Sequence, residues 1–321
     1  MRILTGIQSS GEQHLGNVLG AIKPAIELSK TTTDQSLFFI ANLHTLTSKK
    51  SATDEINNTW FASATWLACG LDIEKDILYR QSDIPQVCEL SWYLSTFTPM
   101  PMLNNSPTYK DKSENLSDVN AGLFTYPILM SADILLYDAD IVPVGKDQKS
   151  HLEMCRDIAK AVNYKLGDVF KIPEAKIKSD VATIPGTDGR KMSKSYNNYI
   201  NIFDDEKKLR KSINNIKNEP ATLEEPKDPD TCNIVNIFKL VANEEQVLDI
   251  CNKYRNGNYG HSHAKNYLYE VILENFKNER ERFNTYKKEP QIIYNILEKG
   301  KKIATEIANE NLSKIRNRLG F

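Results

Sequence analysis

The first half of the chain alternates between short, mostly apolar runs and longer segments in which apolar residues recur every three or four positions. The apolar runs at residues 2–7, 36–41, 77–80 and 141–144 have the length and continuity of parallel strands that are covered on both faces. The segment that begins at Leu15 has instead the spacing of a helix with one buried face. This alternation predicts an α/β fold with a parallel sheet, right-handed crossovers and helices on both sides.

Other segments refine this pattern. Apolar periodicity predicts helices over residues 53–69 and 87–97, and residues 126–137 are apolar nearly all round, as in a buried helix. Pro24 should kink the first helix, because proline cannot continue the helical hydrogen bonds. Residues 99–114 carry turn-forming residues without an apolar period and predict a loop.

Beyond Ser195 the pattern becomes polar and helical, and no further strand pattern occurs. Residues 219–229, with three prolines and many charges, predict a linker loop inside this part. A final helix from about Gln291 has the apolar residues to pack back on the first domain. We therefore expect an α/β domain, a helical domain and a returning C-terminal helix, over residues 1–197, 198–290 and 291–321.

Composition limits the compartment and the partners. The 321 residues, 40% of them hydrophobic, suffice for a sizeable core, and at about 100 to 200 residues per domain they suggest two domains. With 41 basic and 42 acidic residues the formal charge is -1, so any contact with nucleic acid must be a local patch. Because no segment approaches the ~20 apolar residues of a membrane span and no signal peptide is recognisable, we expect a cytoplasmic protein without a membrane partner.

The cysteines predict no cofactor. There are five, an odd number, and no two form a Cys-x-x-Cys pair. Neither a disulfide framework nor a zinc or iron–sulfur site is therefore expected.

The first candidate site follows the first strand. Gly6 and Gly11 give the connection backbone freedom, and a helix begins near Leu15. Free N–H groups and the positive end of the helix dipole make such a helix start a cradle for an anion, beside His14 and Asn17. The spacing fits neither a Walker loop nor a dinucleotide-binding fingerprint.

Further candidates lie at strand ends and in a buried helix. His44 follows the second strand, where ligands of open α/β sheets gather, although a purely structural histidine is an equal alternative. Asp133 is a costly carboxylate in a buried helix and should point with Met130 into one cavity, unless backbone hydrogen bonds satisfy it. Asp147 is placed to cap the next helix, and Gln148 offers both a donor and an acceptor.

Two segments contain mobile lysines. Gly186 and Gly189 flank a basic loop without an apolar period, whose lysines are free to reach out of the fold. Lys112 lies in the loop of residues 99–114. Considered from local sequence alone, the lysines of residues 99–114 are more typical of solvated surface, and the basic loop is typical of a charged turn.

Two short strings resemble the signatures of class I aminoacyl-tRNA synthetases. Residues 14–17, His-Leu-Gly-Asn, resemble the first signature in the form with Asn in fourth place, and residues 191–195, Lys-Met-Ser-Lys-Ser, match the second at the expected distance. Residues 122–127, 130–137 and 142–148 resemble family motifs around the amino-acid pocket. The chain is similar over essentially its whole length to bacterial tryptophanyl-tRNA synthetases. The resemblance implies a Rossmann-like catalytic domain with an all-helical second domain, residues 198–290, that binds the tRNA anticodon.

By matching position, the resemblance implies a catalytic set and two binding sets. The catalytic residues would be Lys191, Lys194, Lys112 and Asn17. The residues that bind ATP would be Gln8, Ser9, Ser10, Gly11, His14, Gly16, Asn17, Gly145, Lys146, Asp147, Lys191, Met192, Ser193, Lys194 and Ser195. The tryptophan pocket would contain Asp133, Met130, Tyr126, Gln148, His44, Gln8, Val142 and Val144.

Three residues depart from the family pattern without removing a needed chemical group. Ser9 stands where the family often has Pro, and His14 where the tryptophan enzymes often have Thr. Lys146 stands where many members have Glu, which changes a charge beside the nucleotide.

The resemblance implies a two-step reaction that needs no protein nucleophile. The carboxylate of L-tryptophan attacks the α-phosphorus of ATP, and the adenylate then acylates the terminal ribose of tRNA(Trp). The lysines would stabilise charge on the leaving phosphates. Mg²⁺ would bridge phosphate oxygens without a dedicated protein site. The resemblance also implies a homodimer that pairs through its nucleotide-binding domains.

Three alternatives stay open. A tyrosyl-tRNA synthetase shares the fold and the signatures, although Met130 and Asp133 favour tryptophan. A small-molecule adenylyl transferase of the same superfamily would not need the helical domain or the lysine loop. A non-catalytic paralogue would bind tRNA or tryptophan without needing Asn17, Lys191 and Lys194.

Overall fold

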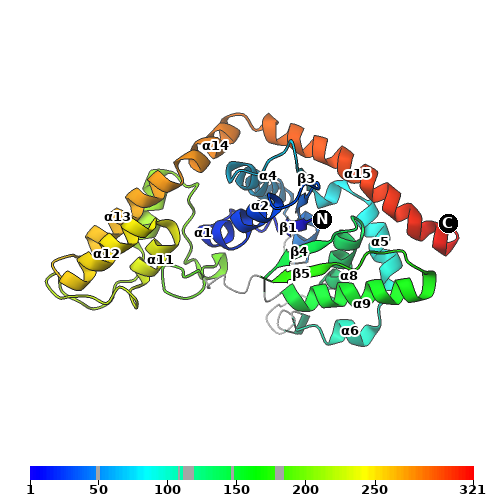
Figure 1. Ribbon diagram of the computed structural model, residues 1–321, viewed down its shortest axis with the longest axis horizontal. Helices are drawn as coiled ribbons and strands as arrows, with labels where there is room; N and C mark the ends of the chain where they lie inside the picture. The colour runs from blue at the N-terminus through cyan, green and yellow to red at the C-terminus, as the bar shows by residue number, and fades with distance from the viewer. Residues whose placement is uncertain (48–50, 108, 111–118, 146–147, 178–183) are drawn as a thin grey trace.

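The computed structural model describes residues 1–47, 51–107, 109–110, 119–145, 148–177 and 184–321 (Figure 1). Three residues expected in the site, Lys112, Lys146 and Asp147, lie outside the described residues. The capping role expected of Asp147 lies outside them as well.

The centre of the first domain is a parallel sheet. Strands β1 (Leu4–Ile7), β2 (Leu37–Ile40) and β3 (Ile77–Arg80) pair side by side, and β4 (Ile141–Val144) pairs with β5 (Glu174–Ile177). A parallel bridge between Ile3 and Ile141 joins the two groups, which gives the order β3-β2-β1-β4-β5. The four strands expected from apolar runs are confirmed. β5 was not expected, because Glu and Lys interrupt its four residues.

Both faces of this sheet are covered. Because neighbouring residues in a strand point to opposite faces, Phe38 and Ile40 of β2 pack into one hydrophobic core and Leu37 and Phe39 into another. In chain order, the segments between the strands contain α2 (Lys23–Ser29), α3 (Asn42–Thr45), α4 (Ala52–Ala68), the 3-10 turn η2 (Gln81–Asp83), α5 (Gln86–Ser95), α8 (Ala121–Leu135) and α9 (Lys149–Leu166). The parallel α/β fold predicted from sequence is confirmed.

The structure differs in detail from two expectations, which concern the first helix and the loop of residues 99–114. The first helix is divided into α1 (Leu15–Asn17), a π-helical turn η1 (Val18–Ile22) and α2, whose first turn contains Pro24. The irregular turn therefore directly precedes the residue that cannot donate to the helix ladder. The loop expected over residues 99–114 was wrong in part, because Met100–Asn104 forms α6, a single turn that buries Leu103.

The second half of the chain is built mainly from helices. In chain order they are α10 (Glu206–Asn214), α11 (Asn233–Val241), α12 (Glu244–Asn256), α13 (His261–Asn275), α14 (Lys277–Lys288) and α15 (Gln291–Leu319). Helices α11 to α13 lie at the opposite end of the molecule from α8 and α9 (Figure 1). Residues 219–229 lie in the connection between α10 and α11, without helix or strand, as the prolines predicted.

The long helix α15 returns to the sheet (Figure 1). A Cβ on Gly300 would lie 1.9 Å from the carbonyl oxygen of Leu78 in β3, so only glycine permits this approach. Glu298 pairs with Arg80 at 2.8 Å, and the Asn311 side chain donates to the carbonyl of Leu136 at 2.9 Å. Among the helices described, none has the length and apolar character needed to cross a membrane.

Candidate active site

The start of α1 is a capped helix terminus beyond the end of β1. His14 is the N-cap, and its Nδ1 accepts from the backbone N–H of Asn17 at 3.3 Å. The Asn17 side-chain oxygen accepts in turn from the backbone N–H of His14 at 3.1 Å. Gly11, with φ of +119°, makes the turn that leads into this cap. The reciprocal cap holds the helix terminus, and its positive end points at the turn.

His14 is neutral at pH 7. Burial, and then the nearby charge of Lys194, lower its pKa to about 4. Because Nδ1 accepts the Asn17 N–H, the proton of the neutral ring is on Nε2. The ring can therefore donate one hydrogen bond to an anion beside the cap.

The lysine-containing loop meets this helix terminus. The backbone N–H of Gly16 donates to Sδ of Met192 at 3.3 Å, and Met192 is buried. A Cβ on Gly11 would lie 3.4 Å from Nζ of Lys194, so this ammonium group lies directly beside the turn. Two segments separated by most of the first domain therefore form a single cationic, donor-rich site.

Asp133 is held by two buried side chains. On α8 it is 2% exposed, and its Oδ2 accepts from Nε2 of His44 at 3.0 Å. Nε2 of Gln81 donates to both carboxylate oxygens at 2.8 Å. Burial raises the pKa of Asp133, and the hydrogen bonds from His44 and Gln81 oppose this rise. The expected alternative of backbone partners is not what the structure has, because both partners are side chains.

A second set of hydrogen-bonded side chains lies beside Asp133, His44 and Gln81, and we call these two sets the polar rows. Nδ1 of His151 bonds Oε1 of Gln148 at 2.9 Å, so the amide oxygen accepts and Nε2 is left to accept from the hydroxyl of Tyr126. The rings of His44 and Tyr126 lie edge to face, with 6.1 Å between their centroids. The structure therefore brings four of the side chains expected around tryptophan into one neighbourhood.

The remaining expected residues differ in exposure. Gln8, Gly145, Lys191 and Ser195 are exposed, and Ser10 is partly so. Met130 and Val144 are partly buried, while Val142 is buried in β4. Ser193 accepts from the backbone N–H of Ser195 at 3.2 Å through its hydroxyl.

Ser9 is directed away from the turn. It is fully buried, and its hydroxyl donates to Glu55 on α4. The same carboxylate accepts from Thr45 at 2.7 Å and from Thr59 at 2.9 Å. The Ser9 side chain therefore fixes the connection after β1 to α4, rather than reaching toward the cradle.

Sequence reasoning missed Gln81 and His151. Gln81 directly follows β3 just as His44 lies after β2, so the same strand-end argument would have found it. His151 lies three residues after Gln148 in the first turn of α9, where the two side chains share a face.

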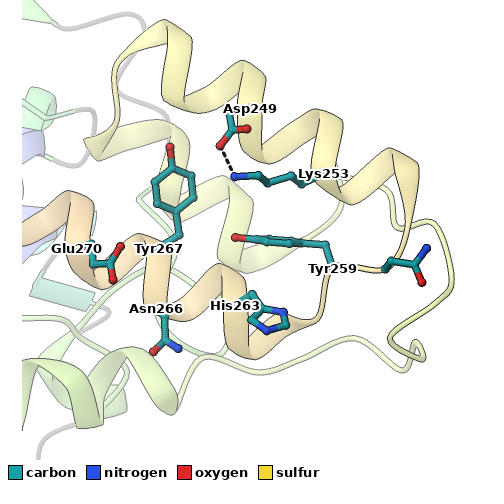
Figure 2. A pocket seen from close by; sticks show the side chains of 8 residues that line it. Asp249, Lys253, Tyr259, His263, Asn266, Tyr267 and Glu270 are labelled. Atoms are coloured by element: carbon teal, nitrogen blue, oxygen red, sulfur yellow. Dashed lines mark hydrogen bonds and ion pairs between the residues drawn. The ribbon is translucent and has the colours of Figure 1, made fainter.

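A second polar site lies far from the first, between α12 and α13 (Figure 2). Its volume is about 610 Å³. Lys253 lies over one face of the Tyr259 ring, 5.6 Å from its centroid, and His263 lies on the other side at 5.6 Å. The remaining lining residues are Asp249, Asn258, Asn266, Tyr267 and Glu270. We call this site the α12–α13 groove.

No metal-ligand cluster of three or more His, Cys, Asp or Glu side chains occurs within the described part of the chain. The donors beside Gly11 are a backbone turn, a neutral histidine and a lysine, which suit phosphate oxygens rather than a cation. A divalent ion at this site would therefore depend on oxygens that the nucleotide supplies.

The sheet order, the capped helix terminus beyond β1 and the lysine loop in contact with it together define a class I aminoacyl-tRNA synthetase. The family model described as tRNA synthetases class I (W and Y) matches residues 1–277, and the chain belongs to this family.

Relatives known by sequence and relatives of known structure agree with this family assignment. The tryptophan–tRNA ligase of Campylobacter jejuni strain RM1221 is 44% identical over 321 residues, all of both chains. That of Fusobacterium nucleatum is also 44% identical, over all of this chain and 98% of its own. The crystal structure of Campylobacter jejuni tryptophanyl-tRNA synthetase complexed with ADP and tryptophan superposes with a TM-score of 0.95 over all of both chains, at 44% identity.

Proposed function

We propose that the chain is a tryptophan–tRNA ligase. It converts L-tryptophan and ATP to tryptophanyl-adenylate and pyrophosphate, and then transfers tryptophan to the 3′ end of tRNA(Trp). The observation that carries the proposal is the contact of Gly16 with Met192, which joins the two signature segments. The tryptophan-specific names of full-length relatives at 44% identity support the amino acid.

ATP binds at the junction of the two segments. His14 Nε2 and the N–H groups of the turn after β1 donate to phosphate oxygens, while Met192 and Gly145 contact the nucleoside. Lys194 and Lys191, with Lys112, engage the phosphates, and Asn17 holds the cap that orients His14. The exposure of Lys191 and the placement of Lys194 beside Gly11 support these roles.

Tryptophan lies beside the two polar rows, with its indole N–H directed to Asp133. Three hydrogen bonds from His44 and Gln81 already hold this carboxylate, and a carboxylate has about four acceptor sites. The carboxylate is therefore pre-oriented and keeps acceptor capacity for the substrate. Tyr126, Gln148, Met130 and the β4 residues Val142 and Val144 complete the pocket.

Catalysis follows from alignment and charge stabilisation. The tryptophan carboxylate attacks the α-phosphorus, the bond to the β-phosphate oxygen breaks, and pyrophosphate leaves. Lys191 and Lys194 stabilise the charge that develops on the leaving group. Mg²⁺ accompanies ATP and neutralises phosphate charge when bound.

The helical part of residues 198–290 binds tRNA. The α12–α13 groove supports this, because its amides and carboxylates can hydrogen-bond the edges of unpaired RNA bases. Asp249 and Glu270 outnumber the single lysine in the groove, which favours a base over a phosphate. The first domain covers residues 1–197, and the helix of residues 291–321 braces the sheet.

The enzyme works as a homodimer in the cytoplasm. Two large side chains on the catalytic domain, Trp92 of α5 and Met100 of α6, are 70% and 60% exposed and support a second subunit that packs against this domain. The pairing leaves the helical part of each subunit accessible to tRNA.

Aminoacylation tests the proposal directly. Purified protein with ATP, Mg²⁺ and tryptophan should esterify a tRNA(Trp) transcript, whereas tyrosine with tRNA(Tyr) should give no product. Charging with tyrosine alone would establish the tyrosyl alternative. Failure with both amino acids, by a folded protein that still binds tRNA, would establish a non-catalytic paralogue.

A further inference from the structure

Asn198 lies inside the lysine loop, three residues beyond the second signature. Its side chain is 2% exposed. The amide nitrogen donates to Oδ1 of Asp188 at 2.7 Å and to the carbonyl of Lys191 at 3.1 Å. The amide oxygen accepts from the backbone N–H of Ser193 at 2.7 Å. One side chain therefore bonds both ends of the peptide segment that carries Met192.

The base of the loop is fitted around the same residue. The carbonyl of Asn198 accepts from the N–H of Thr187 at 2.8 Å. A Cβ on Gly186 would lie 2.4 Å from the Asn198 amide nitrogen and 2.5 Å from its carbonyl oxygen, so a larger residue at position 186 is excluded. Asp188 stays ionised in this arrangement, because Asn198 and Arg190 lower its pKa to about 2.

An amide is the group that fits these partners. It combines two N–H donors with a carbonyl acceptor, whereas a carboxylate only accepts and a methyl group does neither. Without it, the Ser193 N–H and the Lys191 carbonyl lose their partner in a poorly hydrated place. Lys191 is itself exposed, so its side chain has little packing to hold its backbone.

We propose that Asn198 is a positioning residue for the phosphate-binding lysines, which it orients by fixing the backbone of residues 188–193. The proposal rests on the proposed function, because Lys191 and Lys194 must act on ATP for their orientation to matter. A misplacement of about 1 Å is sufficient to slow an aligned reaction by orders of magnitude.

The test is Asn198→Ala in tryptophan-dependent exchange of pyrophosphate into ATP. We expect kcat to fall at least ~10-fold while KM for tryptophan stays within about twofold, because the lysines engage the phosphates and not the indole. Asn311→Ala is the matched control. It removes another buried amide, at 6% exposure, on α15, and should keep kcat near that of the wild type.

A second pair of variants tests the geometry. Asn198→Asp places a carboxylate against that of Asp188 and should lower kcat at least as much as the alanine variant. Adding Asp188→Asn restores a donor to that contact and should recover at least ~3-fold of the loss.

Two results would overturn the proposal. One is a kcat within about twofold of wild type in Asn198→Ala. The other is a fall in kcat that comes with a matching rise in KM for tryptophan and a melting temperature far below that of Asn311→Ala, which marks general structural damage. Exchange by the wild-type enzyme in the same assay separates either result from a failure of the proposed function.

Discussion

Gly16 and Met192 are joined by a hydrogen bond of 3.3 Å from a backbone N–H to a thioether sulfur, across 176 residues of sequence. A Cβ at position 16 would lie 2.9 Å from the His14 ring and 3.5 Å from Cβ of Met192. Glycine at position 16 therefore leaves room for the His14 ring, while its contact with Met192 is of ordinary van der Waals length. The contact brings a helix terminus and a lysine loop to one place, so the proposed ATP site exists only in the folded domain.

Replacing Lys194 with alanine should slow chemistry more than it weakens ATP binding. The lysine engages fully only as charge develops on the leaving phosphates, so its loss is felt in the transition state. Single-turnover adenylate formation should fall about 100-fold while the dissociation constant for ATP changes less than about threefold. Lys207→Ala, an exposed lysine on α10, is the control. A normal single-turnover rate would remove Lys194 from the mechanism.

Removing the Asp133 carboxylate should weaken tryptophan selectively. Asp133→Ala, and Asp133→Asn with nearly unchanged shape, should each raise KM for tryptophan at least ~10-fold and leave KM for ATP nearly unchanged. The asparagine variant keeps the packing around His44 and Gln81, so its effect reports on hydrogen bonding. Wild-type tryptophan kinetics in both variants would make Asp133 a structural group only.

His14 should make stability depend on pH. Its pKa of about 4 lies below the ordinary value of 6.5. Below pH 6.5 the unfolded chain therefore binds a proton at this ring, whereas the folded chain binds one only near pH 4. The free energy of unfolding should therefore fall between pH 7 and 4.5 by about 2 kcal/mol more in wild type than in His14→Gln. Urea titrations of both proteins at the two pH values measure this. Equal losses would show that the ring is not buried as a neutral group.

The α12–α13 groove should serve tRNA and not adenylation. Tyr259→Ala should lower kcat/KM for tRNA(Trp) charging about 10-fold, because this ring lies between Lys253 and His263 and its loss lets both side chains shift in the groove. Pyrophosphate exchange should remain at the wild-type rate. Tyr164→Ala, which removes a 90% exposed tyrosine on α9, controls for loss of an aromatic side chain. Unchanged charging by Tyr259→Ala would exclude the groove as an RNA site.

The local pattern of apolar residues was enough to predict most strands of the sheet, and short strings of residues were enough to locate the two signature segments. The strands β1 to β4 are short apolar runs, which buried parallel strands require. The β5 strand has alternating charged and apolar residues over only four positions, and its strand state depends on pairing with β4. The single turn α6 was missed because a helix this short leaves no periodicity to detect.

The partners inside the site were harder to predict, because they depend on tertiary packing. Asp133 was expected in a cavity with Met130, but nothing in the spacing of α8 indicated that His44 and Gln81 from two strand ends would hold it. Ser9 was expected near ATP from its position, yet its hydroxyl donates to Glu55 of α4. The spacing of residues along a helix predicts which face a side chain lies on, but it does not predict which side chains from other elements contact it.

The most direct test of the whole account is exchange of radiolabelled pyrophosphate into ATP by the wild-type protein, with each amino acid supplied separately. A tryptophan–tRNA ligase should require Mg²⁺ and tryptophan for exchange, and exchange should be at least ~100-fold slower with tyrosine or phenylalanine at the same concentration. Exchange driven equally well by tyrosine, or none with tryptophan in a protein shown to be folded, would contradict it.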